Sequence, residues 1–170
     1  MSVDIRICSS QSDIEAIARL ANEIWQEHFT PIIGAGQVAY MVEKFQSVHA
    51  IADAVNNQGY RYYMAFENGE LIGYCGVQPQ QNELFLSKLY LRKDCRGRGI
   101  SKQLLAEAVA YCKQLGHPSI YLTVNKHNDN TIAIYQRMGF TIDDAVVSDI
   151  GNGYVMDDYI MRLLIGKRGK

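Results

Sequence analysis

The fold of this chain is decided by residues 84–101, whose sequence is LFLSKLYLRKDCRGRGIS. Residues 83–92 are largely apolar at successive positions, which predicts a central strand covered on both faces. Strict alternation places two sets of side chains on opposite faces: Leu84, Leu86, Lys88 and Tyr90 against Phe85, Ser87, Leu89 and Leu91. A turn at residues 96–101 follows, and a helical pattern continues from it to residue 115.

The turn combines two glycines with Arg96 and Arg98 directly before the helix. The first N–H groups of a helix lack intrahelical partners and lie at the positive end of its dipole, and glycines let an anion approach them closely. This pattern predicts a phosphate or pyrophosphate cradle. The pattern is too short for a P-loop, which needs G-x-x-x-x-G-K-S/T, and it is not a G-x-G-x-x-G turn, because Lys102 stands three residues after Gly99. A tight turn with solubilising arginines is the alternative interpretation.

The order Arg96-x-x-Gly99-x-Ser101 resembles the acetyl-coenzyme A signature Q/R-x-x-G-x-G/A of the GNAT N-acetyltransferase superfamily. Ser101 departs from the usual Gly or Ala, but its side chain is compact. One predicted helix and one predicted strand separate this signature from a second segment, described next. The two motifs in this order are more specific than either one alone.

Residues 124–140, VNKHNDNTIAIYQRMGF, are similar to the family's second motif, N-x-x-A-x-x-L-Y-x-K-x-G-F. Asn128 and Tyr135 occupy its Asn and Tyr positions. Thr131 stands where Ala is common, and Arg137 keeps the positive charge of the usual Lys. The resemblance therefore covers residues 84–140.

The resemblance implies acetyl-CoA as co-substrate, with its acyl-pantetheine arm along the strand backbone and its pyrophosphate on the turn. The residues implied for binding it are Leu89, Tyr90, Leu91, Arg96, Gly97, Arg98, Gly99, Ile100, Ser101, Asn128 and Arg137. The implied reaction is direct attack of an amine on the thioester, with a backbone N–H near Leu91 facing the developing oxyanion. Tyr135 corresponds to the family's acid, which protonates the leaving sulfur.

The general base is not assigned by the motifs. Many relatives place a carboxylate along the central strand, whereas this chain has Phe85 and Ser87 there. Glu83 at the strand start could act through water, and a solvated strand end is the alternative. Cys95 lies beside the positive helix start, which predicts a lowered thiol pKa. No motif ties a histidine to it, so a nucleophilic thiol is not expected.

The N-terminal part predicts a strand at residues 3–8 and then a helix that begins at a capping box, Ser12 to Glu15. Thr30-Pro31 predicts the end of this helix and a loop over residues 30–36. Short helices at 38–45 and 48–55 follow, then strands 60–67 and 71–78 joined by an Asn68-Gly69 hairpin turn. Further predicted elements are a strand at 119–124, a helix at 128–138, strands at 140–147 and 154–164, and a basic tail at 166–170.

These elements predict one domain over residues 1–170 with an α/β (α+β) fold. The resemblance implies a GNAT-like mixed, mostly antiparallel sheet of about seven strands, flanked by helices and splayed between its two central strands. In this superfamily the acceptor pocket is built by the first helices and the loops near the last strands, here residues 22–36 and 149–158. Acidic and aromatic side chains there suit a cationic amine, with Glu27 and His28 in the first region and Asp149, Tyr154, Asp157 and Asp158 in the second.

The helix end at residues 25–29, the Leu89-Tyr90-Leu91 strand and residues 128–135 are also similar to bacterial spermidine/spermine N-acetyltransferases. A small amine or a polyamine is thus the expected acceptor, and Glu83 is a further candidate residue for it. A protein or peptide N-acetyltransferase and a non-catalytic acyl-CoA sensor remain as alternatives, because the sequence distinguishes neither an acidic slot nor an open groove.

Composition limits the partners and the compartment. A net charge of −1 over 170 residues disfavours a dedicated nucleic-acid binder. The four cysteines and four histidines show no metal-ligand spacing, so no metal is expected, and free thiols indicate a reducing compartment. No signal-peptide pattern or membrane-length apolar run is present, which predicts a cytoplasmic protein without a membrane partner. Aromatic-rich strands favour a homodimer.

Overall fold

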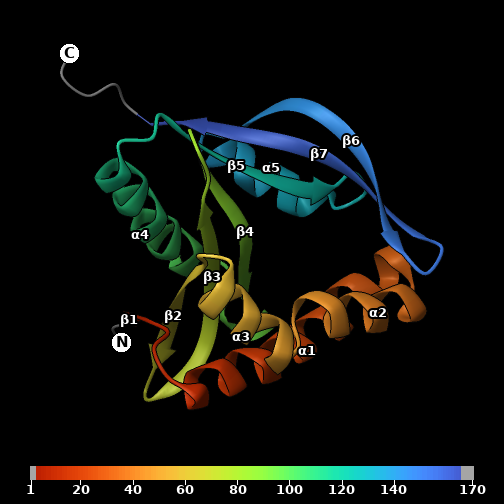
Figure 1. Ribbon diagram of the computed structural model, residues 1–170, viewed down its shortest axis with the longest axis horizontal. Helices are drawn as coiled ribbons and strands as arrows, with labels where there is room; N and C mark the ends of the chain where they lie inside the picture. Colours follow the sequence, from red (N-terminus) through yellow and green to blue (C-terminus); the bar gives the residue numbers. More distant parts are fainter. Residues whose placement is uncertain (1–2, 166–170) are drawn as a thin grey trace.

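Seven strands form one sheet in the order β1-β2-β3-β4-β5-β7-β6 in the computed structural model, which describes residues 3–165 (Figure 1). The strands are β1 (Asp4–Ile7), β2 (Arg61–Glu67), β3 (Glu70–Pro79), β4 (Leu84–Leu91), β5 (Ser119–Asn125), β6 (Thr141–Gly151) and β7 (Tyr154–Leu164). The helices are α1 (Gln11–Ile33), α2 (Ala35–Phe45), α3 (Val48–Asn57), a 3-10 turn η1 (Lys93–Cys95), α4 (Ile100–Leu115) and α5 (Asp129–Arg137). Helices α1–α3 cover one face of the sheet, and α4 and α5 cover the other.

The sheet is antiparallel except where β4 meets β5. These two central strands are parallel and pair only at Leu84 with Ile120 and at Phe85 with Tyr121. From there to their carboxyl ends they diverge. The last six residues of β4 therefore lie beside β3 on one edge and have no strand paired to the other edge. The expected mixed, splayed seven-stranded sheet is confirmed.

The predicted strict alternation along β4 is wrong. A register shift opposite β3 makes Lys88 face Gly76 while Leu86 faces Val77, which leaves Ser87 as an extra, unpaired residue. Such a bulge reverses the side-chain directions beyond it. Leu86 therefore packs in the α4-side core together with Leu91, whereas Tyr90 packs on the α1 side.

Helix α1 differs from its prediction at both ends. Its N-cap is Ser10, whose Oγ accepts the Asp13 N–H at 3.1 Å, and not Ser12. The Asp13 carboxylate completes the cap by accepting the Ser9 N–H at 2.9 Å and by pairing with Arg6. At the other end the predicted loop over 30–36 is wrong, because Pro31 lies inside the last turn and the helix continues to Ile33, with Gly34 as its C-cap.

The apolar surface around the helix end explains this continuation. The avoidance of the α region before proline is a bias, which tertiary packing can override. Trp25 and Phe29 form a core cluster with Val38 and Met41 of α2, and Ile33 packs against it. Gly34 adopts φ +90° and lets α2 begin immediately after α1.

The other predicted elements are present with shifted ends. Asn68 and Gly69 both have positive φ, as the predicted two-residue hairpin turn requires. Strand β6 extends to Gly151, past the predicted end at 147. The prediction stopped short because an exposed edge strand shows little apolar alternation in its sequence. The predicted tail at 166–170 lies outside the described residues.

The tip of the β6–β7 hairpin lies beside α2, far from it in the sequence (Figure 1). Tyr40 Oη donates to the Ile150 carbonyl at 2.8 Å, and Gln37 Nε2 donates to the Val155 carbonyl at 2.8 Å. All four cysteines are buried and free. None of the helices described between residues 3 and 165 is long and apolar enough to cross a membrane.

The cap assignment can be tested with two serines that are two positions apart. Ser10→Ala is expected to lower the free energy of unfolding by about 1 kcal/mol, because it removes the acceptor for a first-turn N–H. Ser12→Ala should cause no loss, since Ser12 is an exposed helical position. Urea denaturation of the two variants measures the difference, and a larger loss for Ser12→Ala would restore the predicted capping box.

Candidate active site

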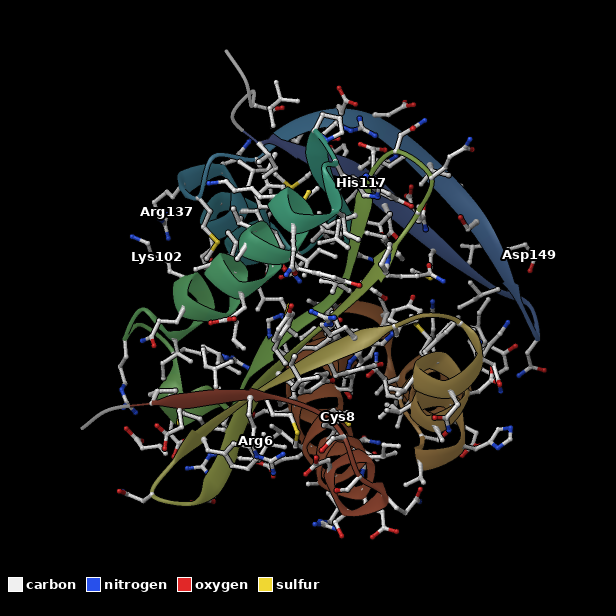
Figure 2. All side chains as sticks on the ribbon, turned by 60° about the vertical axis from the view of Figure 1, so that its left-hand side comes forward. Arg6, Cys8, Lys102, His117, Arg137 and Asp149 are labelled. Atoms are coloured by element: carbon white, nitrogen blue, oxygen red, sulfur yellow. The ribbon has the colours of Figure 1, made fainter. Side chains whose placement is uncertain are left out.

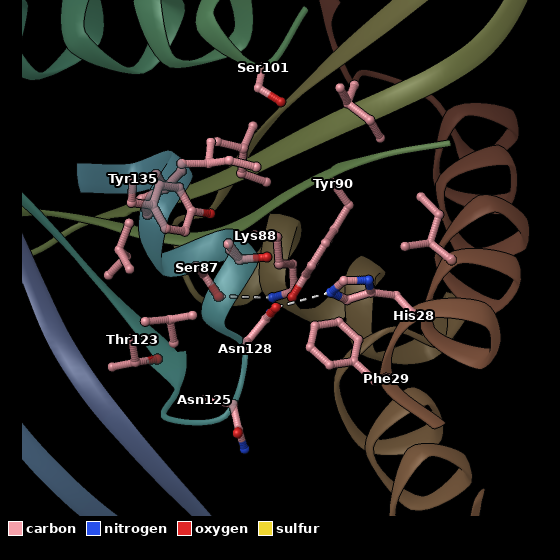
Figure 3. Close-up of a pocket in the computed structure, with 18 of the residues that line it drawn as sticks. His28, Phe29, Ser87, Lys88, Tyr90, Ser101, Thr123, Asn125, Asn128 and Tyr135 are labelled. Atoms are coloured by element: carbon pink, nitrogen blue, oxygen red, sulfur yellow. Dashed lines mark hydrogen bonds between the residues drawn. The ribbon is translucent and has the colours of Figure 1, made fainter. Parts of the chain in front are cut away.

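The divergence of β4 from β5 opens into a cavity of about 810 Å³ (Figure 3). Its walls come from α1 and α2 on one side and from β5, β7 and α5 on the other, and the turn before α4 closes one end. No group of three or more His, Cys, Asp or Glu side chains that could hold a metal occurs within residues 3–165.

At the α4 end, the turn is shaped to hold an anion. Gly97 and Gly99 have φ of +78° and +80°, and a Cβ on either would meet no atom within 4 Å, so the concave side is open. No side chain caps α4, and its first described backbone bond is from the Gln103 N–H to the Gly99 carbonyl, so the N–H groups of residues 100–102 lack protein acceptors in the described chain. This open cradle fits the pyrophosphate that the sequence predicts there.

The charged residues near the cradle divide into two groups. Arg96, Lys102 and Arg137 line the cavity, and Figure 2 shows Lys102 and Arg137 on the same side of the molecule. Arg96 also donates from Nε and Nη2 to the Leu91 carbonyl at 3.3 and 3.1 Å, which fixes the turn to the end of β4. Arg98 instead pairs with Glu67 and does not line the cavity.

The middle of the cavity brings the two motifs together. Leu89, Tyr90 and Leu91 line it from β4, opposite Asn128 and Tyr135. Asn128 Oδ1 lies 3.3 Å from Nε2 of His28 on α1, so this contact joins α1 to the start of α5. Burial lowers the pKa of His28.

Tyr135 is buried, with its ring packed at 5.5 Å from that of Phe140. Its hydroxyl is directed toward the cavity in Figure 3. Burial raises the pKa of Tyr135 well above its usual value, and the nearby Tyr90 raises it further. The phenol therefore keeps its proton at neutral pH, which suits a proton donor.

Aromatic rings dominate the α1–α2 end. The ring of Trp25 lies 4.2 Å from that of Phe29 and 5.9 Å, edge-on, from that of Tyr90. Met41 of α2 and Met156 of β7 complete this wall. The surface suits an apolar body or, through the ring faces, a cation.

Lys88 of β4 lines the cavity, which the sequence did not predict. Its side chain is 7% exposed, its Nζ donates to Ser87 Oγ at 3.1 Å, and it lies 4.8 Å from the centre of the Tyr60 ring. No carboxylate within residues 3–165 pairs with it, and burial lowers its pKa to about 8. The available signal was a lone lysine within an apolar strand, but only the bulge at Ser87 shows which face it occupies.

Asp158 on β7 is the only carboxylate among the described residues that line the cavity. It is 4% exposed, and burial raises its pKa to about 6. The sequence places Asp158 in the expected acceptor region together with Asp149 and Asp157, but alternation along a hairpin does not show which of these acidic residues is buried.

Two residues expected near the acceptor lie elsewhere. Glu83 accepts from Ser119 Oγ at 2.6 Å and pairs with Arg162, and this pairing lowers its pKa. It does not line the cavity, so its geometry is that of an ion-paired strand end. Glu27 faces a separate shallow depression together with Glu23 and Arg92, while His28 on the same helix lines the cavity.

The expected low pKa of Cys95 is wrong. The thiol is 2% exposed, and its burial raises the pKa, with the neighbouring Asp94 carboxylate acting in the same direction. These two effects exceed the lowering by Arg92 and Arg98. Cys95 therefore contributes to the core beside the turn.

Comparison with known proteins adds independent evidence. The family model described as "Acetyltransferase (GNAT) family" matches residues 17–140. The chain is 28% identical over 153 residues to a spermidine N(1)-acetyltransferase of Thermoplasma acidophilum, an alignment that covers 88% of this chain and 94% of that protein.

Solved structures agree with this match. The crystal structure of PaiA N-acetyltransferase from Thermoplasma acidophilum in complex with coenzyme A superposes with a TM-score of 0.81 at 25% identity, covering 96% of this chain and 99% of that one. The ribosomal-protein-S18-alanine N-acetyltransferase of Escherichia coli has a TM-score of 0.71 at 20% identity over 99% of this chain and 97% of its own, and so shares the fold.

The buried charge of Lys88 generates a stability prediction. Lys88→Met is expected to raise the free energy of unfolding at neutral pH by about 1–2 kcal/mol, because desolvation of the ammonium outweighs its cation–π contacts. Below about pH 8 both folded and unfolded chains carry the proton, so the full gain is present there. Between about 8 and 10.5 the folded wild type loses the proton first and becomes more stable, so the gain shrinks.

Urea denaturation at several pH values measures this gain. The exposed Lys93→Met serves as the control and should change stability by less than about 0.5 kcal/mol at every pH. A loss of stability in Lys88→Met at neutral pH would contradict the prediction.

Proposed function

This chain belongs to the GNAT family of acetyltransferases, and on that premise we propose that it transfers the acetyl group of acetyl-CoA to the primary amine of a small molecule. The observation that carries the proposal is the splayed cavity, which has an open anion cradle at one end and a buried carboxylate among aromatic rings at the other. A polyamine is the first named candidate, because a relative at 28% identity is a spermidine N(1)-acetyltransferase.

The residues present fit acetyl-CoA. The free N–H groups of residues 100–102 would receive the pyrophosphate, and Lys102 and Arg137 would face further phosphate oxygens. Bound there, acetyl-CoA supplies an activated thioester carbonyl. The chain positions it with the unpaired edge of β4 and with the buried amide of Asn128.

The direction of the β4 backbone supports an oxyanion donor at Leu91. The Arg92 N–H donates to the Ile72 carbonyl of β3 at 2.8 Å. Backbone groups alternate in direction along an antiparallel strand, so the Leu91 N–H is turned away from β3, toward the side from which β5 has diverged. A backbone N–H fixed in this way can stabilise negative charge as it develops on a carbonyl oxygen.

Tyr135 is the proposed acid for the leaving sulfur. Its buried phenol lines the cavity opposite Leu89–Leu91 and keeps its proton, since burial raises its pKa. The same burial keeps water away from the reacting bonds, which strengthens electrostatic interactions there.

Two observations bear on the acceptor. The name of the Thermoplasma relative favours a polyamine. Within the described cavity lining, however, the single carboxylate of Asp158 and the cation of Lys88 favour an acceptor that brings one ammonium to the reaction centre.

Release of free CoA thiol from acetyl-CoA tests the proposed function. The panel contains spermidine, spermine, small monoamines, amino acids and short peptides, with an N,N-dimethylated monoamine as the matched non-acceptor. We expect turnover with a small primary amine and none with its dimethylated form. Turnover with peptides alone would indicate a protein N-acetyltransferase, and tight acetyl-CoA binding without any turnover would indicate a sensor.

Tyr135→Phe tests the acid. It is expected to lower kcat by about 100-fold and to change the Kd of acetyl-CoA by less than about 3-fold, because it removes a proton donor and keeps the ring. Tyr121→Phe is the control, since the Tyr121 hydroxyl bonds Gln80 outside the cavity. Steady-state kinetics and calorimetry of both variants give the comparison, and an unchanged kcat in Tyr135→Phe would remove it from catalysis.

A further inference from the structure

Asp158 is a buried carboxylate that the described chain leaves without a hydrogen-bond donor. It lies on β7 opposite Asn125 of β5, where the splayed strands form the cavity wall, and it is 4% exposed. No N–H or O–H group within residues 3–165 donates to its oxygens. Because Asp158 lines the cavity, a ligand there can supply the charge and the hydrogen-bond donors that the described chain does not.

Among the charged and titratable groups around Asp158, Lys126 lowers its pKa, but no described cation forms an ion pair with it. Asp157 precedes it on β7 and, by strand alternation, points to the opposite side, where it pairs with Lys126 at 2.9 Å. Tyr90 from β4 lies close enough for the Asp158 charge to contribute to the raised pKa of its phenol. His28 of α1 contacts Asn128 instead, and the β6 residue opposite Asp158 is Val146.

The described surroundings thus leave a position for a cation in the cavity beside Asp158 and Tyr90, whose ring contacts that of Trp25. We propose that Asp158 binds the ammonium of the acceptor and accepts its proton, which makes it the general base of the transfer. This assignment rests on the proposed function and deepens it. It defines the acceptor class as a primary alkylammonium with an apolar body, which the Trp25–Phe29 rings contact.

The transfer moves one acetyl group and releases one proton. Asp158 takes one proton from the ammonium, and the freed nitrogen lone pair forms a C–N bond to the acetyl carbon as the C–S bond breaks. Tyr135 gives its proton to the leaving sulfur and regains one from the new C–N nitrogen. Asp158 then loses its proton to solvent, so that the products are the N-acetyl amine, CoA thiol and one proton.

The pKa of Asp158 suits this role. Burial raises it to about 6, with the Asp157 charge raising it and Lys126 lowering it. At neutral pH the group is therefore ionised and able to accept a proton, yet it is more basic than an exposed carboxylate. Activity should rise with pH through about 6 as Asp158 ionises.

The experiment compares Asp158→Asn with Asp157→Asn, using a primary monoamine from the panel that the wild type acetylates. In Asp158→Asn, kcat/KM near neutral pH should fall by about 100-fold or more, while the Kd of acetyl-CoA changes by less than about 3-fold. In the pH–rate profile, the rise in kcat/KM near pH 6 should disappear. The residual rate should instead rise with pH toward the pKa of the amine itself.

Asp157→Asn should keep kcat within about 3-fold, since Asp157 does not line the cavity. It should move the rise in activity near pH 6 to lower pH, because it removes a negative charge that raises the pKa of Asp158. A second variant, Asp158→Ala, should regain turnover on addition of formate, which a structural role would not produce.

The outcomes separate the two proposals. Turnover that survives in Asp158→Asn with an unchanged pH profile, or a lack of formate rescue in Asp158→Ala, would overturn the assignment of Asp158 and leave the proposed function intact. Absence of wild-type turnover with every amine would overturn the proposed function and this assignment with it.

Discussion

The cavity depends on the short pairing between β4 and β5, which are joined by only two pairs of residues at their starts. A parallel pair that continued to Leu91 would satisfy the free edge of β4 and leave no space between the strands. Because β5 diverges, the backbone of Leu89–Leu91 faces a cavity, and the walls come from α1, β7 and α5. The Arg96 guanidinium holds the Leu91 carbonyl, so the end of the strand and the anion cradle keep a fixed relation.

Much of this arrangement could be predicted from local sequence. The glycines at 97 and 99 and the Asn68-Gly69 turn depend on short-range backbone chemistry, which a few neighbouring residues determine. The position of Tyr135 followed from the resemblance to the GNAT motif. The predictions were wrong at both ends of α1, where tertiary packing and not local sequence sets the helix boundaries. Pro31 is helical because an aromatic cluster holds the last turn, and the cap moved to Ser10 because Asp13 also pairs with Arg6 of β1.

The acceptor end was the least predictable part, for a geometric reason. A bulge at Ser87 reverses which side chains of β4 face the cavity, and no residue type marks such a bulge in a single sequence. The sequence therefore did not predict that Lys88 lines the cavity. Glu83, which was predicted near the acceptor, pairs with Arg162 at the far end of the strand. Among the acidic residues of 149–158, burial distinguishes Asp158, and burial is a property of the assembled sheet.

The contact between α2 and the tip of the β6–β7 hairpin has a consequence for folding kinetics. Gln37 and Tyr40 bond residues 118 and 110 positions away, so these two contacts join α2 to the β6–β7 hairpin across most of the chain. Closure of so long a loop is slow compared with formation of the β2–β3 hairpin. The cavity is thus expected to be completed late, after both halves of the sheet exist, so that a partly folded chain would already have the strand–turn–helix unit but no enclosed acceptor end.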